Sequence, residues 1–362
     1  MRFSPGELRE HFSKIGMHEN NVSEEMLSGM EPIRETCFEL ETRPEPKEIL
    51  ENLKAMWESA PGPDLITVSM LINGGSALNE KVVNTIQQMW ESEPESWEQI
   101  CHQAEVITLF KKGARHSLDN YRGICLLQVI SRLVARIAAR RLSAYVEAHD
   151  IIATEQCGFR PNRSATDAVF VMSRIMADGC RQDDPDPLVL DMMDIKKAYP
   201  NCSRNAMDKA LELVGVPPKL RNILAKLDSL TSYQCRSAVG LSEAYSTLRG
   251  CREGCPAAPI KFNILHHVAT MELRKKWKEM GLANKVQVLS YEDQAVWPSP
   301  QGIPRRQMDK LSADQSLGVC DLELMGYADD TTIVTRVSEC DERRKYTYEV
   351  YGAWGHTIHP DK

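Results

Sequence analysis

The stretch LELMGYADDTTIVTRV, residues 322–337, limits the fold of this 362-residue chain more than any other segment. Apolar and β-prone residues flank an Ala-Asp-Asp tripeptide, a pattern that predicts a β-hairpin with Asp329 and Asp330 at its turn. Adjacent carboxylates repel each other unless water or a cation takes up their charge. We therefore predict a carboxylate pair at one end of a sheet.

A second acidic strand end lies in PLVLDMMDIKKAYPNCSR, residues 187–204. The apolar run 188–193 predicts a strand buried on both faces, and Asp191 and Asp194 lie at or near its end. If this strand neighbours the hairpin, its acids and the pair at the turn converge. Two Mg²⁺ ions, or Mn²⁺ in their place, would neutralise such a cluster and leave coordination positions for phosphate oxygens.

The charge of the chain is unevenly distributed. The net charge of −7 argues against nucleic acid as a partner, but residues 107–142 hold eight Lys and Arg against one acid. Within a helix predicted for about 131–148, three arginines recur at i, i+4 and i+8 and share one face: Arg132, Arg136 and Arg140. Binding of a polyanion and a simple solvated face both remain open.

The N-terminal part is acidic, with thirteen Glu against seven Lys and Arg in residues 1–60. We interpret 1–48 as a loosely attached leader and linker. Residues 49–60 predict a helix with Ile49, Leu53 and Trp57 near one apolar face, ended by the PGPD stretch. Strands are expected at 106–113 and 121–127, and an insertion at about 282–320.

Composition narrows the class of protein. Hydrophobic residues make up 42% of the chain, which is enough for a large core, and no apolar run approaches the ~18 residues of a membrane span. The N-terminus lacks a signal-peptide core, and the eleven cysteines form no zinc pattern. These features favour an intracellular protein with free thiols and without a membrane partner.

Seven blocks, in order, resemble the reverse transcriptase domain of non-LTR retrotransposons, the LINE and R2-like elements. They are APGPDLIT (60–67), ITLFKKG…DNYRGICLLQVISRLVARIAARRL (107–142), EQCGFRPNRSATDAV (155–169), DIKKAY (194–199), GCREGCPAAPIKFNI (250–264), YADD (327–330) and GHTIHPDK (355–362). The blocks span most of the chain.

The resemblance implies an α+β fold with the fingers and palm of a right-hand polymerase, an antiparallel palm sheet packed on helices, and no thumb. The fingers would span 49–186 and the palm 187–362. The implied function is RNA-directed DNA synthesis by two-metal nucleotidyl transfer from a dNTP to a primer 3′-OH. The implied partners are an RNA template, a DNA primer and dNTPs; the sequence does not give an oligomeric state.

The resemblance also assigns roles to single residues. The family's first palm motif places an aromatic residue five positions after the metal-binding Asp, which selects Asp194, followed by Tyr199, over Asp191. Tyr199 would be the steric gate under the incoming sugar. The other implied roles are metal binding by Asp329, Asp330 and the carbonyl of Ile195; triphosphate contacts by Lys111 and Arg122; substrate binding by Glu253, and by Gly254 and Pro256, which shape the substrate loop; and nucleic-acid contacts by Arg132, Arg136, Arg140, Arg160 and Arg163.

Two departures from the family pattern carry charge. Glu253 stands where Gln is usual, and Lys261 replaces an apolar residue. The chain also ends at the last palm motif. Two alternatives therefore stay open: a truncated or inactive retroelement remnant that at most binds RNA, and a group II intron-like maturase. For an active element we expect a nuclear location.

Overall fold

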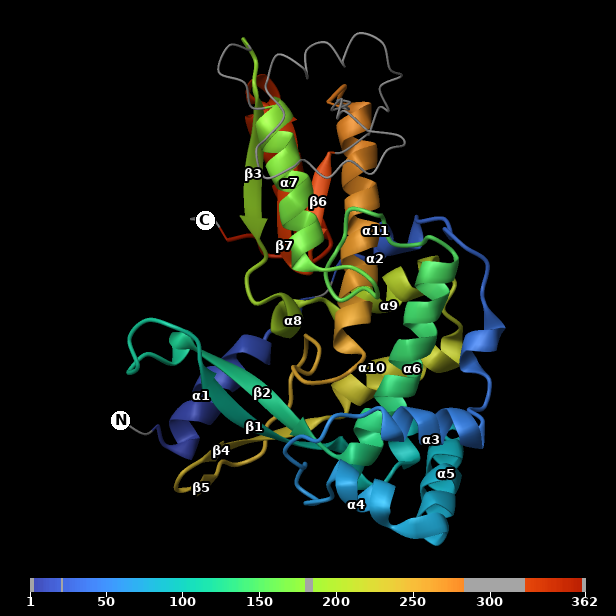
Figure 1. Ribbon diagram of the computed structural model, residues 1–362. Coiled ribbons are helices and arrows are strands. Elements are labelled where there is room, and N and C mark those ends of the chain that lie inside the picture. The colour runs from blue at the N-terminus through green and yellow to red at the C-terminus, as the bar shows by residue number, and fades with distance from the viewer. Residues whose placement is uncertain (1–2, 21, 180–184, 283–322, 360–362) are drawn as a thin grey trace, which may run out of the picture. The chain divides into compact units, whose positions relative to one another are not determined.

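The computed structural model describes residues 3–20, 22–179, 185–282 and 323–359. The chain forms two compact units, each assembled from segments that are distant in sequence. Unit 1 combines 1–153, 195–270 and 351–358, and unit 2 combines 154–194, 271–350 and 359–362. Both contain helices and strands, so the fold is mixed α/β (Figure 1).

Unit 1 is built around a four-stranded sheet of order β2-β1-β4-β5. β1 and β2 pair antiparallel, and β1 and β4 pair parallel. The strands are β1 (Gln103–Phe110), β2 (Tyr121–Leu127), β4 (Ser232–Ser237) and β5 (Gly240–Leu241). The helices are α1 (Pro5–Gly16), α2 (Glu24–Ser28), α3 (Pro46–Lys54), α4 (Val68–Asn73), α5 (Gly75–Glu91), α6 (Val129–Ala148), α8 (Ala198–Asn201), α9 (Arg204–Leu213) and α10 (Pro218–Ser229).

The predictions of local structure in unit 1 are confirmed for its hairpin and its basic helix. β2 coincides with the strand expected at 121–127, whereas β1 begins and ends three residues before the strand expected at 106–113, so that 111–113 belong to the basic tip 111–120 that joins the two strands. α6 buries the apolar stripe of its sequence, including Val134, Ile137 and Leu142, each fully buried. Its period of 3.6 residues leaves the arginine row on the opposite side.

The predicted helix at 49–60 ends earlier than expected. α3 stops at Lys54, with Ile49 and Leu53 buried, while Trp57 lies beyond the helix and is 87% exposed. The expectation that Trp57 shares an apolar face with Ile49 and Leu53 was therefore wrong. The PGPD segment that follows packs its backbone against the junction of β2 and α6, since a Cβ on Gly62 would lie 2.6 Å from the backbone nitrogen of Gln128.

An ion network is buried in unit 1. Asp228 of α10 is 3% exposed, and its carboxylate forms ion pairs with Lys261 and with Arg252. Burial alone would raise the pKa of Asp228, but the two cations lower it below its usual value. The unusual Lys261 thus has a structural partner, and Arg252 is directed to Asp228.

A histidine pair packs with two aromatic rings in unit 1. His266 and His356 have ring centroids 5.6 Å apart and contact Phe262 and Tyr351. Burial lowers the pKa of His266 to about 3, with the neighbouring histidine charges adding to the effect, and lowers that of His356 to about 4. Both rings are therefore neutral in the folded chain at neutral pH.

This pair predicts loss of stability in mild acid. Both folded-state pKa values lie below the unfolded value of about 6.5, so the unfolded chain binds more protons as the pH falls below that value. Between about pH 7.5 and pH 5.5, each histidine should cost about 1.4 kcal/mol of unfolding free energy. Urea unfolding at the two pH values measures the change. His356→Leu should remove about half of it, and an unchanged pH dependence in this variant would contradict the assignment.

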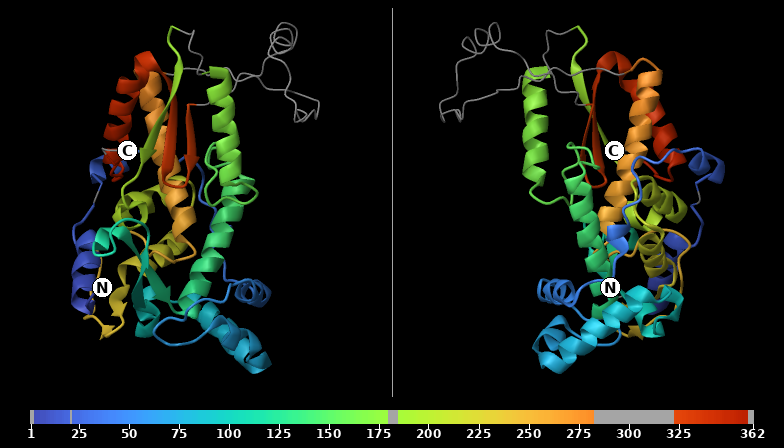
Figure 2. Two further views of the ribbon diagram at one scale, coloured as in Figure 1. Left: turned by 60° about the vertical axis from the view of Figure 1, so that its left-hand side comes forward. Right: turned by 90° about the vertical axis from the view of Figure 1, so that its right-hand side faces the viewer.

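Unit 2 contains a three-stranded antiparallel sheet of order β3-β7-β6. The strands are β3 (Leu188–Asp194), β6 (Leu324–Tyr327) and β7 (Asp330–Arg336). Helix α7 (Ala165–Gly179) lies alongside β6, and its Ala168 and Ile175 pack into one core with residues of all three strands (Figures 1 and 2). Ser164 and Asp167 form a capping box at the start of this helix.

One expectation for unit 2 was wrong. The run 188–193 was predicted to be buried on both faces, but β3 is an edge strand and Met192 is 66% exposed. Uniform apolarity therefore did not mark a central strand here. Among the described residues, the remaining α-helices are α11 (Ala258–Glu279) and α13 (Cys340–Ala353), and each contributes residues to both units.

The two units do not follow consecutive ranges of the sequence, as the expected boundaries at 48/49 and 186/187 would require. Residues 1–48 also belong to unit 1, where Leu8, Val22, Leu27 and Leu40 are buried. The insertion expected at about 282–320 lies outside the described residues, except for Leu282. None of the helices among the described residues is long and apolar enough to cross a lipid bilayer.

Candidate active site

The candidate carboxylates come together at one end of the unit 2 sheet. β6 and β7 form the predicted hairpin, closed by the pair Tyr327 and Asp330, so that Ala328 and Asp329 make its two-residue turn. Asp330, which was also expected at the turn, is instead the first residue of β7. Asp330, on β7, is paired directly with Asp194, the last residue of the neighbouring strand β3. The backbone register thus places three acids from segments 135 residues apart at the same sheet end.

The donor chemistry of these acids fits a hard divalent cation. Like charges directly opposite each other on neighbouring strands destabilise a sheet, and a cation bound between them removes that penalty. Mg²⁺ prefers carboxylate oxygens and commonly takes only one or two from a protein. The side chains of the described residues do not include three His, Cys, Asp or Glu already gathered as a metal site. The residues therefore fit a site completed by substrate oxygens better than a closed cage.

Asp191, the alternative acid on β3, has a partner of its own. Arg344 donates from Nε and from an Nη to the two carboxylate oxygens of Asp191 at 3.0 and 2.9 Å. This two-pronged bond raises the pKa of Arg344. Asp191 thus serves an ion pair on the sheet, which agrees with the choice of Asp194 as the candidate metal ligand.

The side chain of Gln156 holds the turn that carries Asp329. Its amide oxygen accepts from the N–H of Ala328 at 2.8 Å and from the N–H of Gly158 at 2.8 Å. Its amide nitrogen donates to the carbonyl of Ala328 at 3.2 Å. Ala328 has a φ of +59°, in the left-handed region that a non-glycine residue enters only when its surroundings hold it there.

Gly158 lets the two segments approach this closely. A Cβ at position 158 would lie 2.2 Å from the backbone nitrogen of Ala328, so only glycine fits. Gln156 and Gly158 both lie in the block 155–169, but no role for either was predicted from the sequence. The only signal for them was that block, because the partner Ala328 lies 172 residues away from Gln156.

Gln156→Leu is expected to loosen this turn. The substitution leaves three buried backbone groups without their partner, at a total cost of about 3 kcal/mol of unfolding free energy. Urea unfolding measures the loss. Gln156→Glu keeps an oxygen acceptor for both N–H groups and should lose less. Equal stability of the Leu variant and the parent chain would contradict the role of this amide.

The two arginines of the same block differ in exposure. Arg160 is 7% exposed, and its guanidinium donates to the carbonyl of Gln156 at 3.2 Å. Arg163 is partly exposed and donates to the carbonyl of Thr154 at 2.8 Å. Arg160 therefore supports the loop that holds the carboxylate turn, and only Arg163 has surface to offer a ligand.

Tyr199 and Ile195, two further predicted site residues, lie in unit 1. Ile195, Ala198 and Phe262 form a buried cluster against which Tyr199 packs, with the rings of Tyr199 and Phe262 5.3 Å apart. The carbonyl of Tyr199 accepts from the N–H of Cys251 at 2.8 Å. The first palm motif is thus joined to the loop 250–256 through the backbone.

The predicted triphosphate contacts belong to the β1–β2 hairpin. Lys111 directly follows β1, and Arg122 lies on β2; both are exposed. Partial burial and the charges of Lys196 and Lys111 lower the pKa of Lys197, while Asp119 and Glu253 oppose this. Lys197, which the sequence analysis did not single out, therefore adds a cation to the same neighbourhood as Lys111 and Glu253.

The structure brings two groups of predicted residues together around one cavity of unit 1. Gly254 and Pro256 line it from the loop 250–256, and Arg132 and Arg136 line it from α6. Gly254 has a φ of +109°, and a Cβ there would lie 2.8 Å from the carbonyl oxygen of Cys125 on β2. Arg140 is exposed on α6 beyond the cavity lining.

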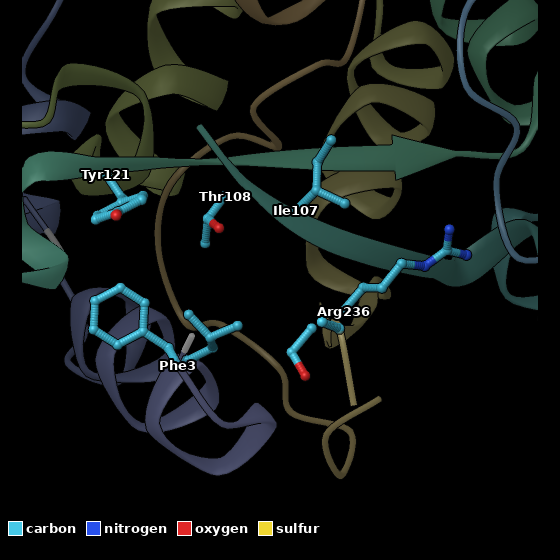
Figure 3. A pocket seen from close by; sticks show the side chains of 8 residues that line it. Phe3, Ile107, Thr108, Tyr121 and Arg236 are labelled. Atoms are coloured by element: carbon cyan, nitrogen blue, oxygen red, sulfur yellow. The ribbon is translucent and has the colours of Figure 1, made fainter. Parts of the chain in front are cut away.

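A second cavity of unit 1 contains none of the predicted residues in its lining. Residues of α1, the hairpin and β4 surround it, among them Phe3, Tyr121 and Arg236 (Figure 3). Arg236 forms an ion pair with the buried Glu105. The Arg236 guanidinium of this cavity therefore already has Glu105 as its partner.

The sequence of this chain matches a known protein family. Residues 110–362 match the family described as reverse transcriptase (RNA-dependent DNA polymerase), which covers well over half of the chain. The chain belongs to the reverse transcriptase family. The match begins at the end of β1 and includes both carboxylate strands of unit 2.

A curated relative is the retrovirus-related Pol polyprotein from type-1 retrotransposable element R2 of Popillia japonica. The two chains are 24% identical over 214 residues, which cover 58% of this chain and 28% of that polyprotein. The reverse transcriptase described here thus spans a little over a quarter of this relative, and the similarity supports the resemblance to R2-like elements.

Proposed function

We propose that this chain is the RNA-directed DNA polymerase domain of a LINE-like or R2-like retroelement. The observation that carries the proposal is the register that pairs Asp194 with Asp330 and puts Asp329 in the adjoining turn, in a chain of the reverse transcriptase family. The substrates would be an RNA template, a DNA primer and dNTPs. In this reading, the β1–β2 hairpin belongs to the fingers and the β3-β7-β6 sheet to the palm.

In this mechanism Asp194 and Asp329, with the support of Asp330 and the carbonyl of Ile195, would hold two Mg²⁺ ions. When bound, these ions would stabilise the negative charge that develops on the transferred phosphoryl group. Lys111 and Arg122 would bind the triphosphate, and Tyr199 would lie under the sugar and exclude a 2′-OH. The protein acts by positioning and electrostatics, without a covalent intermediate.

Glu253 is the feature that favours the second candidate, an inactive remnant that binds RNA. Gln can donate a hydrogen bond to a substrate, but an ionised Glu can only accept one. The nearby Lys197 offsets this charge in part, since the charge of Glu253 raises the pKa of Lys197. We therefore place the polymerase first.

RNA-templated primer extension tests the choice. The polymerase should extend a DNA primer on RNA in Mg²⁺ or Mn²⁺ and stop when EDTA removes the metal. Binding of RNA without extension, both in this chain and in a chain continued past Lys362, would favour the remnant. RNA splicing activity without extension would favour the maturase.

A further inference from the structure

Helix α1 lies outside the part of the chain that matches the reverse transcriptase family, which begins at residue 110. It is nevertheless firmly held in unit 1. Leu8 of this helix is 2% exposed, and Arg249 donates from Nε to the carbonyl of Ile15 at 2.9 Å. The N–H of Leu248 donates to the carbonyl of Gly16 at 2.8 Å. A helix fixed in this way can support whatever packs on its other side.

The β1–β2 hairpin packs on α1 with one face. Phe3, just before the helix, contacts Tyr121 edge to face, with the ring centroids 5.4 Å apart (Figure 3). Phe12 packs directly on the backbone of β2, since a Cβ on Gly123 would lie 2.8 Å from its ring. Successive residues of a strand point to opposite faces, so Tyr121 and Gly123 both face α1 and Arg122 points away from it. Arg122 is accordingly exposed.

The contact of Phe3 reaches the basic tip 111–120 through further rings. Tyr121 is paired with Phe110 across the hairpin, and their ring centroids are 5.3 Å apart. The guanidinium of Arg115 lies 4.8 Å from the centroid of the Phe110 ring. The hydroxyl of Tyr121 donates to the carbonyl of Arg115 at 2.9 Å. Phe3 is thus connected through Tyr121 to both sides of the tip.

The hairpin has little other support near its tip. β2 is an edge strand in which Leu127 alone is buried, and the tip 111–120 contains no buried residue. The N–H of Cys125 donates to the carbonyl of Glu253 at 2.8 Å, but this bond lies toward the other end of β2. Segments with few buried contacts open at a low cost in free energy. The order of the hairpin tip therefore depends on its contacts with α1.

We propose that Phe3 and Phe12 are positioning residues for the triphosphate of the incoming dNTP, because they hold the hairpin that carries Lys111 and Arg122. The inference rests on the proposed function, in which these two cations bind that triphosphate. Neither ring would touch the substrate, since both pack on the face of the hairpin opposite to Arg122. A guanidinium binds phosphate best in one fixed orientation, so a looser hairpin should lose affinity.

Calorimetric titration of the chain with inorganic triphosphate tests this role without catalysis. Phe3→Ala should raise the Kd roughly 2- to 10-fold, the factor that corresponds to one lost aromatic pair, while Phe3→Tyr should keep most of the affinity. Phe12→Ala should raise the Kd as well. Arg122→Gln, which removes a binding charge, should raise it at least as much. Phe38→Ala is the matched control and should bind as the parent chain does, since Phe38 is 64% exposed in the same unit.

Hydrogen exchange of the free chain shows which segment changes. Backbone amides of 108–124 should exchange faster in Phe3→Ala and in Phe12→Ala than in the parent chain. One of them is the N–H of Lys111, which donates to the carbonyl of Asn120 at 2.8 Å. Amides of α6 should keep their exchange rates in both variants, so that a general loss of stability is distinguished from a looser hairpin.

Several results would overturn the inference: no binding of inorganic triphosphate by the parent chain, a Kd unchanged by Arg122→Gln, or a Kd or hairpin exchange unchanged by both phenylalanine variants. A loss in Phe38→Ala as large as that in Phe3→Ala would do the same. The proposed function fails separately. Primer extension with an unchanged Kd in both variants refutes only the role of α1, whereas weaker triphosphate binding by Phe3→Ala without any primer extension refutes only the polymerase.

Discussion

Asp329→Ala is expected to abolish RNA-templated primer extension, with a fall in rate of about 10³-fold or more. Removing a carboxylate that holds the cation forfeits several kcal/mol of transition-state stabilisation, and each 1.36 kcal/mol is a factor of ten. Asp194→Ala should be equally inactive, because its side chain lies on the strand paired with the other half of the site. Single-turnover extension with excess enzyme measures both rates.

Asp191→Asn is the matched control for these variants. Asp191 is on the same strand three residues before Asp194, but its carboxylate binds Arg344. This variant should stay within about tenfold of the parent rate. Asp330→Asn should fall between the two, as a supporting charge. Activity retained in Asp329→Ala would remove the carboxylate pair from the mechanism.

Asp228→Ala is expected to cause the largest loss of stability, about 3–5 kcal/mol of unfolding free energy. The substitution leaves Lys261 and Arg252 buried without their shared acid, and a buried charge without its partner is strongly destabilising. The loop 250–256 should loosen as well, since the N–H of Arg252 also donates to Asp228 at 3.2 Å. Urea unfolding gives the energy, and hydrogen exchange reports on the loop.

Two variants bracket this expectation. Asp208→Ala removes an acid paired with Arg221 on the neighbouring helix, where the carboxylate side chain is 41% exposed, and should cost at most about 1 kcal/mol. Lys261→Met leaves Asp228 paired with Arg252 and should cost less than Asp228→Ala. Equal losses in Asp228→Ala and Asp208→Ala would mean that the network contributes little.

Local features of this chain were predictable because they depend on neighbouring residues. The alternation and turn chemistry of 322–337 predicted the hairpin, and the apolar stripe of 131–148 predicted α6. The placement of Trp57 failed, since apolar spacing continued past Lys54 while the helix did not. A pattern gives the face that a helix would have, but only tertiary contacts decide where the helix ends.

The residues that position the candidate site and the loop 250–256 could not be predicted from the sequence, because their contacts join distant segments. Nothing local to Gln156 indicates that its amide holds Ala328, and nothing local to Lys261 indicates Asp228 on another helix. The same holds for Asp191, whose partner Arg344 lies 153 residues away. Motifs identified the candidate reacting groups, and only the fold identified what positions them.

In the proposed polymerase, the end of β3 and the β6–β7 turn together bind the divalent cation. Replacing Mg²⁺ by Fe²⁺ in the presence of ascorbate and peroxide generates hydroxyl radicals at the bound ion, which cleave the nearby backbone. Mapping the cuts by mass spectrometry should give two clusters, near 194 and near 327–331. Excess Mg²⁺ and the Asp194→Asn substitution should each suppress both clusters. Cuts at only one of the two segments, or cuts unaffected by Asp194→Asn, would contradict a shared site.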